Sequence, residues 1–237
     1  MSLVTERIRY SYDGIEFEGH FAYDDAIDGT RPLVTVSHAW SGRSPFENEK
    51  AEKLAAMGYA GFAIDAYGAG VRGTTREENS ALMTPMLDNR SELLERLRAG
   101  VAAGAAHAVA DETRIAAIGY CFGGLCALDL ARSGDPLAGV ASFHGLFHAP
   151  DWPVNNIKAK VLALHGYDDP MATPDSVLAL AKELSDAGAD WQLVAYGNTK
   201  HSFTNPLADD PANGIVYDAS ANARSWLALE HFLTEIF

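Results

Sequence analysis

The chain has 237 residues and a formal charge of −14, from 18 lysines and arginines against 32 aspartates and glutamates. This acidic balance repels polyanions and leaves no basic stripe for phosphate contacts, so we expect no nucleic-acid partner. Hydrophobic residues make up 48% of the chain, which suffices for a sizeable buried core and excludes an intrinsically disordered protein. No linker-like stretch divides the sequence, and we predict one domain over residues 1–237.

The sequence shows no targeting or membrane-spanning segment. The first thirty residues lack a basic segment followed by an apolar run, and no apolar stretch approaches the roughly 18–20 residues of a membrane span. The two cysteines, Cys121 and Cys126, lie on different faces of one predicted helix, where a disulfide between them would be strained. A reducing compartment suits both as free thiols. We expect a cytoplasmic protein without a membrane partner, and a homo-oligomer is compatible with this sequence.

The predicted elements begin with a hairpin and continue as alternating strands and helices. Arg7–Tyr12 and Glu16–Tyr23 alternate apolar and polar residues on either side of Asp13-Gly14, a typical hairpin turn. Further strands are predicted at 33–37, 60–64, 114–118, 137–143, 160–164 and 191–196. Helices are predicted at 46–57, 76–110 with an interruption at Pro85, 122–132, 174–187 and 213–237. This order predicts an α/β fold with a mostly parallel sheet, an antiparallel N-terminal edge and helices on both faces. Ligands should bind beyond the carboxyl ends of the strands.

The stretch Gly119-Tyr120-Cys121-Phe122-Gly123 lies between a predicted apolar strand and an Ala/Leu-rich helix. This is the context of the G-x-nucleophile-x-G elbow, in which the central residue occupies a strained strand-to-helix turn and the glycines allow close backbone approach. A lone cysteine near a glycine is usually a small core residue. Here the context favours Cys121 as a nucleophile, whose thiolate the positive end of the following helix would stabilise.

A cysteine nucleophile needs a base and a group that orients the base. Asp168 and Asp169 follow the predicted strand 160–164, and His201 follows the next predicted strand. The order nucleophile, acid, histidine is that of α/β-hydrolases. At this point either aspartate can be the acid, and the other is then a turn or cap residue.

Two backbone N–H groups are needed to stabilise the oxyanion that forms on the attacked carbonyl. In an elbow these come from the residue after the nucleophile and from the loop after an earlier strand. The sequence places Phe122 and Trp40 at these positions.

Other candidate residues have simpler interpretations. Cys126 lies inside the helix after the elbow and is expected in the core. His144 and His148 have the i, i+4 spacing of metal ligands, but they lie on a proline-bounded loop without the glutamate of an HExxH motif. His38 and His165 each end a strand, where a buried, hydrogen-bonded imidazole is expected.

The chain resembles the dienelactone hydrolase family of α/β-hydrolases. The resemblance rests on three segments, with support from Ser37-His38, Gly58-Tyr59 and residues 65–68. The three segments are Gly119–Gly124, His165–Pro170 and His201–Pro206. The resemblance covers nearly the whole chain and implies a single-domain α/β-hydrolase fold. In that family the acid is the third residue after the strand-end glycine, which here is Asp169.

One position departs from the family pattern. Members active on dienelactone carry a glutamate directly after the position of His38, where it pairs with the cysteine and helps to regulate its ionisation. This chain has Ala39 there. The difference predicts that Cys121 relies on His201 alone.

Together these observations predict a hydrolase with a Cys121–His201–Asp169 triad that cleaves an ester, a lactone or a related activated acyl compound. We expect a small-molecule substrate and neither a cofactor nor a metal. Two alternatives stay open at this point. One is a redox-sensing or ligand-binding protein on the same fold, with Cys121 and Cys126 as a sensing pair. The other is a thioesterase or another acyl hydrolase.

Overall fold

The computed structural model describes residues 2–154 and 156–237, which form two compact units, 1–118 and 119–237. Each unit is described by itself. The strand order is β1-β2-β4-β3-β5 over the first unit and β6-β7-β8 over the second. The single domain inferred from the sequence stays a prediction.

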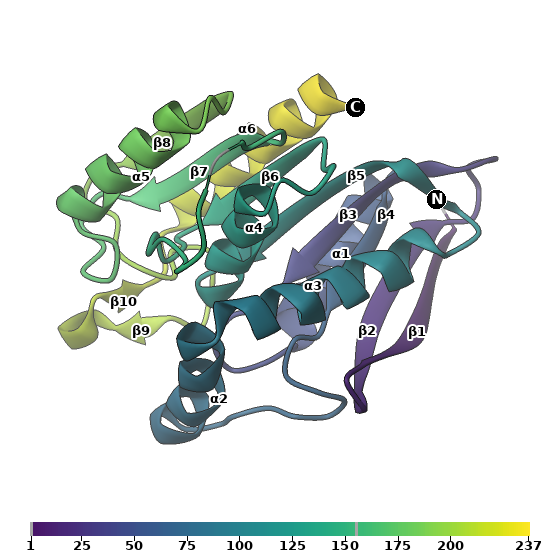
Figure 1. Ribbon diagram of the computed structural model, residues 1–237, viewed down its shortest axis with the longest axis horizontal. Coiled ribbons are helices and arrows are strands. Elements are labelled where there is room, and N and C mark those ends of the chain that lie inside the picture. The colour runs from purple at the N-terminus through teal and green to yellow at the C-terminus, as the bar shows by residue number, and fades with distance from the viewer. Residues whose placement is uncertain (1, 155) are drawn as a thin grey trace. The chain divides into compact units, whose positions relative to one another are not determined.

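The first unit begins with the predicted hairpin. Strands β1 (Leu3–Tyr12) and β2 (Ile15–Asp24) pair antiparallel around a two-residue turn, Asp13-Gly14, in which both residues have positive φ angles of 46° and 75°. This conformation is the reason for a glycine in such a turn. Strand β2 pairs antiparallel with β4 (Ala60–Ile64), and β4 pairs parallel with β3 (Arg31–Ser37). The predicted antiparallel edge is therefore confirmed (Figure 1).

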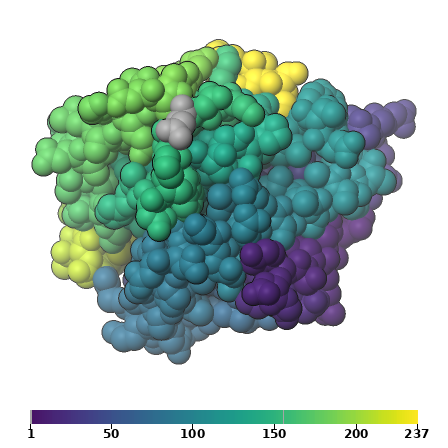
Figure 2. All heavy atoms as spheres, viewed as in Figure 1, coloured from purple at the N-terminus to yellow at the C-terminus, as the bar shows by residue number. Residues whose placement is uncertain are grey.

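Helices cover both faces of this part of the sheet. They are α1 (Pro45–Ala56) and α3 (Arg90–Ala105), and α2 (Arg76–Asp88) contacts α3. A Cβ on Gly61 of β4 would meet the backbone of Ala51 in α1, whereas a Cβ on Gly104 of α3 would meet the ring of Phe62. Because neighbouring strand residues point to opposite faces, α1 and α3 lie on opposite sides of β4. Figure 2 shows the side chains of α2 and α3 at the surface of the first unit.

The helical region was predicted to be interrupted at Pro85, but the interruption lies at Asn89. Helix α2 continues through Pro85, and the chain turns at Asn89, whose backbone is not helical (φ −130°, ψ 75°). The Asn89 side chain accepts a hydrogen bond from the N–H of Glu92 and so caps α3. An asparagine side chain competes for local backbone groups in this way, which makes it a good helix boundary.

Among its described residues, the second unit has a sheet of three parallel strands and three α-helices. The strands are β6 (Gly139–Phe143), β7 (Lys160–Gly166) and β8 (Trp191–Tyr196). The helices are α4 (Phe122–Arg132), α5 (Pro174–Asp186) and α6 (Ala219–Ile236). Strand β5 (Ala110–Tyr120) leads into α4, which packs on β6, and α6 packs on β6 and β7. Parallel strands alternating with helices confirm the predicted α/β fold class.

The last predicted helix begins later than expected. Residues 209–216 form a short ribbon instead, with β9 (Asp209–Asp210), a 3₁₀ turn (Pro211–Asn213) and β10 (Ile215–Val216). Helix α6 begins after Asp218, whose carboxylate accepts the N–H of Ala221 at 2.7 Å. Within the described residues, no helix is both long and apolar enough to cross a bilayer.

Candidate active site

The predicted elbow is a sharp turn between β5 and α4. Cys121 has φ +58° and ψ −117°, a conformation that non-glycine residues rarely adopt, and its side chain is nearly buried. Its N–H donates to the carbonyl of Phe143, the last residue of β6, at 3.0 Å. A Cβ on Gly119 would lie 1.9 Å from the carbonyl oxygen of Gly123, so these glycines allow the close approach that the motif predicts.

His201 and Asp169 form a buried pair. The Nδ1 of His201 lies 2.7 Å from an Oδ of Asp169, and both side chains are almost completely inaccessible. The other carboxylate oxygen of Asp169 accepts the N–H of Met171 at 2.8 Å. Asp168 is exposed to solvent. Of the two aspartates left open by the residue pattern, Asp169 is therefore the partner of His201.

The second ring nitrogen of His201 lies in a different environment from the first. Nε2 is buried and makes no hydrogen bond of standard geometry within the described residues. Burial would lower the pKa of His201, but the charge of Cys121 and the hydrogen bonds with Asp169 and Cys121 outweigh burial and raise the pKa to about 10. The contact with Cys121 is thus looser than the bond to Asp169, as is common in the absence of a substrate.

Backbone contacts from the short ribbon hold His201 in place. The His201 N–H donates to the carbonyl of Gly214 at 2.9 Å, and its carbonyl accepts the N–H of Val216 at 3.0 Å. The sequence pattern does not predict this support. The only sequence signal for this ribbon is the turn-rich segment 209–214, because strands of two residues are too short to show an alternating pattern.

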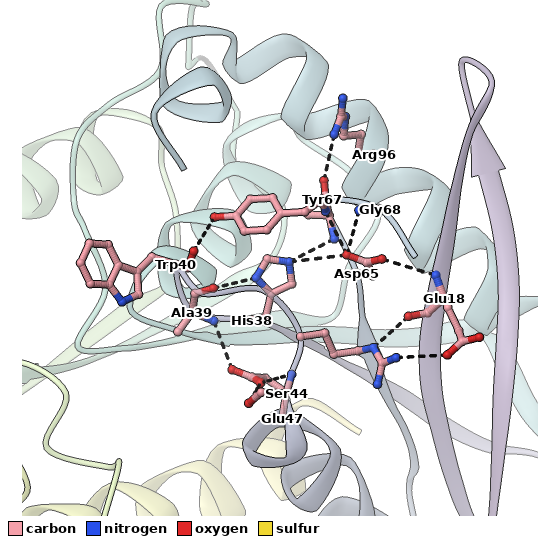
Figure 3. Close-up of polar contacts among 12 residues, drawn as sticks. Glu18, His38, Ala39, Trp40, Ser44, Glu47, Asp65, Tyr67, Gly68 and Arg96 are labelled. Atoms are coloured by element: carbon pink, nitrogen blue, oxygen red, sulfur yellow. Dashed lines mark hydrogen bonds and ion pairs between the residues drawn. The ribbon is translucent and has the colours of Figure 1, made fainter. Parts of the chain in front are cut away.

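Trp40 lies in the first unit, in the loop between β3 and α1 (Figure 3). Its carbonyl accepts the hydroxyl of Tyr67 at 3.0 Å, and the carbonyl of Ala39 lies 2.7 Å from Nδ1 of His38. Gly42 N–H donates to the same Ala39 carbonyl at 3.1 Å. These bonds fix the peptide planes of the loop. In the part of the chain that the structure describes, the Trp40 N–H donates to no acceptor.

Ala39, which stands at the position of the family's glutamate, uses its backbone to bind a different carboxylate. Its N–H donates to Glu47 at 3.2 Å. The buried Glu47 also accepts the N–H and the hydroxyl of Ser44, the residue that caps α1. Glu47 therefore serves as the acid of a capping box and fixes the loop that precedes the helix.

The remaining histidines divide as follows. His38 is buried and hydrogen-bonded, as predicted. His165 is buried, but neither of its ring nitrogens has a hydrogen-bond partner among the described residues, and burial lowers its pKa. His144 binds the hydroxyl of Thr204 through Nε2 at 2.7 Å.

Among residues 2–154 and 156–237, no group of three or more His, Cys, Asp or Glu side chains has the arrangement of a metal site.

Both cysteines are free thiols in the structure. Cys126 is buried within α4, in agreement with the predicted core position. Phe122 is the first residue of that helix.

Several known proteins are similar to this chain in sequence or in fold. The chain is 34% identical over 158 residues to the Caenorhabditis elegans protein K02A2.1, covering 63% of this chain and 98% of that protein. A solved structure described as a dienelactone hydrolase-like promiscuous phosphotriesterase from metagenomic libraries is 33% identical, with a TM-score of 0.95 and full coverage of both chains. Another, named m3DLH, is 34% identical with the same TM-score and coverage. The model of the dienelactone hydrolase family matches residues 17–237. The chain therefore belongs to the dienelactone hydrolase family.

Proposed function

We propose that this protein is a cysteine hydrolase in which Cys121 is the nucleophile, His201 the acid–base and Asp169 the residue that orients His201. The observation that carries the proposal is the buried 2.7 Å bond between His201 and Asp169, combined with the influence of Cys121 on the same imidazole. A histidine bound to a carboxylate through one nitrogen and facing a nucleophile with the other is the arrangement that triad catalysis requires.

The reaction has two stages. The Cys121 thiolate attacks the carbonyl carbon, and the tetrahedral intermediate collapses as the leaving alkoxide takes a proton from the His201 imidazolium. This gives a thioester on Cys121 and a neutral His201. His201 then removes a proton from water, the hydroxide attacks the thioester, and the acid product leaves as the thiolate–imidazolium pair is restored. The cycle needs no cofactor or metal.

The N–H groups of Phe122 and Trp40 are the proposed oxyanion donors. Phe122 supports this role by its place at the start of α4, where the helix dipole adds to the stabilisation of negative charge. Trp40 supports it by an N–H without an acceptor among the described residues, on a loop whose carbonyls are already bound.

The substrate class is an ester, a lactone or a related activated acyl compound of small size. With Ala39 in place of the glutamate, no carboxylate side chain stands at that position to pair with the thiol. Cys121 then depends on His201 for its ionisation. Substrates with good leaving groups, such as aryl esters and strained lactones, suit this arrangement because their leaving groups require less proton transfer.

A second candidate activity follows from one comparison. One of the solved structures that match this chain at full length is described as a promiscuous phosphotriesterase. A thiolate in an elbow can attack a triester phosphorus as it attacks a carbonyl, with expulsion of an aryloxide. We propose activated phosphotriesters as a secondary substrate class, to be assayed beside the acyl panel.

The test compares Cys121→Ala with Cys126→Ala. Hydrolysis of a panel of aryl esters, lactones, thioesters and an aryl phosphotriester should be abolished by the first change and retained by the second. Because Cys126 is also buried in α4, the pair controls for loss of packing. Full turnover by Cys121→Ala on any substrate of the wild-type enzyme would refute the proposed mechanism.

The same pair of variants separates hydrolysis from redox sensing. A sensor would form a Cys121–Cys126 disulfide after mild peroxide treatment, detectable by mass spectrometry, and would show a flat, inactive substrate panel. That result would favour the alternative over the proposed hydrolase.

A further inference from the structure

The end of β6 contacts both the nucleophile and the base of the proposed triad. Phe143 accepts the N–H of Cys121 through its carbonyl at 3.0 Å. His144, the next residue, makes an edge-to-face contact with the ring of His201, with centroids 5.2 Å apart and planes at 68°. Two consecutive residues therefore support the two groups that must meet during catalysis.

His144 is itself firmly held. Its N–H donates to the carbonyl of Leu164 in β7 at 2.8 Å, and its Nε2 lies 2.7 Å from the hydroxyl of Thr204. Both side chains are buried, with exposed fractions of 2% and 1%. The His144 ring also makes an edge-to-face contact with Phe203, at 5.1 Å between centroids and 82° between planes.

The backbone of His144 has φ +37°, a left-handed conformation that is costly for any residue with a Cβ. Such strain persists only where the surroundings determine the conformation, and it tends to occur at functional sites. Here the strained backbone is accompanied by contacts to the segment 201–204, which carries the proposed base and turns through Ser202 at φ +57°.

We propose that His144 is a positioning residue, which fixes the ring plane of His201 through its edge-to-face contact and through its bond to Thr204. The inference rests on the proposed function of His201. It assigns to His144 a role that needs no metal and no direct contact with substrate. Asp169 holds one end of the imidazole, and His144 prevents rotation and tilt of its plane.

The structure explains why a histidine suits this position. A phenylalanine could supply the ring contact but not the bond to the buried Thr204 hydroxyl, which would then lose its partner.

The experiment uses His144→Phe, Thr204→Val and Thr204→Ser in the full chain. The first two remove the hydrogen bond from either side, and the third keeps a hydroxyl. Because small misplacements of a base reduce rates by up to about a hundredfold, we expect His144→Phe and Thr204→Val to lower kcat by about ten- to a hundredfold, with little change in KM. Thr204→Ser should recover most of that loss. The double variant should be little worse than either single one.

A second readout separates positioning from loss of folded protein. The pKa of His201 is raised by groups that act only when the ring is in place, so both bond-breaking variants should shift the alkaline limb of activity to lower pH. Alkylation of Cys121 by iodoacetamide reports the ionisation of the Cys121–His201 pair without any substrate, because the thiolate is the reactive form. It remains measurable even if the panel of substrates shows no hydrolysis, so failure of the proposed function is distinguishable.

The opposite results would overturn the inference. If His144→Phe and Thr204→Val fold with unchanged melting temperature, keep the wild-type kcat and keep the alkaline limb, His144 does not position His201. If all three variants lose activity only in proportion to lost folded protein, with the pH profile unchanged, His144 is a packing residue alone.

Discussion

Two histidines of this protein end or follow a strand and lie beside an aspartate, yet the structure uses them in opposite ways. In the second unit, His201 binds Asp169 through Nδ1 at 2.7 Å and has no hydrogen bond of standard geometry at Nε2 within the described residues. In the first unit, Nε2 of His38 stands 4.0 Å from Asp65. The comparison teaches that a buried His–Asp pair can serve the proposed proton transfer only where one ring nitrogen is left for a reacting group.

Both ring nitrogens of His38 are hydrogen-bonded to backbone groups. Its Nδ1 lies 2.7 Å from the carbonyl of Ala39, so it donates there, and its Nε2 accepts the N–H of Ala66 at 3.1 Å. Accepting at Nε2 and donating at Nδ1 fixes the neutral tautomer. His38 therefore joins the loop after β3 to the loop after β4 and has no nitrogen left for proton transfer.

Asp65 and Asp169 also differ in the hydrogen-bond partners of their carboxylates: Asp65 binds backbone N–H groups, whereas Asp169 also binds a histidine. Asp65 accepts the backbone N–H groups of Tyr67, Gly68 and Glu18, at 2.9, 3.2 and 3.4 Å. Its carboxylate stabilises a turn and the adjoining strand. Asp169 gives one oxygen to Met171 and the other to a side chain that can move a proton.

The largest expected effect is that of His201→Gln. The amide can still donate to Asp169 but cannot carry a proton, so kcat/KM for an aryl ester should fall on the order of 10⁴-fold. Stopped-flow or steady-state assays on folded protein measure this. A variant that kept more than a tenth of the activity would remove the distinction between the two histidines.

Asp169→Asn should lower kcat/KM by about 10²–10⁴-fold. The carboxylate helps to raise the pKa of His201 to about 10 by favouring the charged imidazolium, so its loss moves that pKa downward. The alkaline limb of the rate profile should therefore shift to lower pH. An unshifted limb would show that Asp169 does not tune His201.

Asp65→Asn is the matched change in the first unit. Loss of a charged acceptor for backbone N–H groups should reduce the free energy of unfolding by about 1.5–3 kcal/mol. Urea titration measures this change. The alkaline limb should stay where it is in the wild type, and a shift like that of Asp169→Asn would show that the two pairs do not differ as the geometry indicates.

The smallest effects come from two tyrosine hydroxyls. Tyr67→Phe removes the bond to the Trp40 carbonyl and should cost about 0.5–1.5 kcal/mol of stability. The hydroxyl of Tyr196 is buried without a partner in the described residues, and burial raises its pKa to about 12. Tyr196→Phe should therefore be neutral or stabilising. Thermal unfolding of the two variants compares them directly. Equal destabilisation would contradict the conclusion that the Tyr67 hydroxyl is hydrogen-bonded and the Tyr196 hydroxyl is not.

The sequence predicted most of what positions the elbow. Helix 122–132 and strand 191–196 match their predicted bounds, because glycines and apolar runs mark them clearly. The choice between Asp168 and Asp169 could not be made from spacing alone, since it depends on which side chain the turn after β7 buries. The family resemblance selected Asp169, which is the aspartate that His201 contacts in the structure.

Other features depend on contacts distant in sequence. Nothing in the local pattern distinguishes His144 from His148, because the value of His144 arises from Thr204, sixty positions away. The ribbon of β9 and β10 is too short to produce a period. The helix boundary at Asn89 was not predicted, because Pro85 is the stronger helix breaker in general. In the structure, α2 nevertheless accommodates Pro85.

The backbone of Cys121 has a consequence for selection. At φ +58° and ψ −117°, glycine is the residue that this turn would prefer on conformational grounds alone. Cys121→Gly should therefore leave the fold intact or make it more stable by up to about 1 kcal/mol, while removing the proposed nucleophile. A thiol at this position is thus a residue that selection for stability would tend to replace. Its retention in the chain would require selection for what the thiol does.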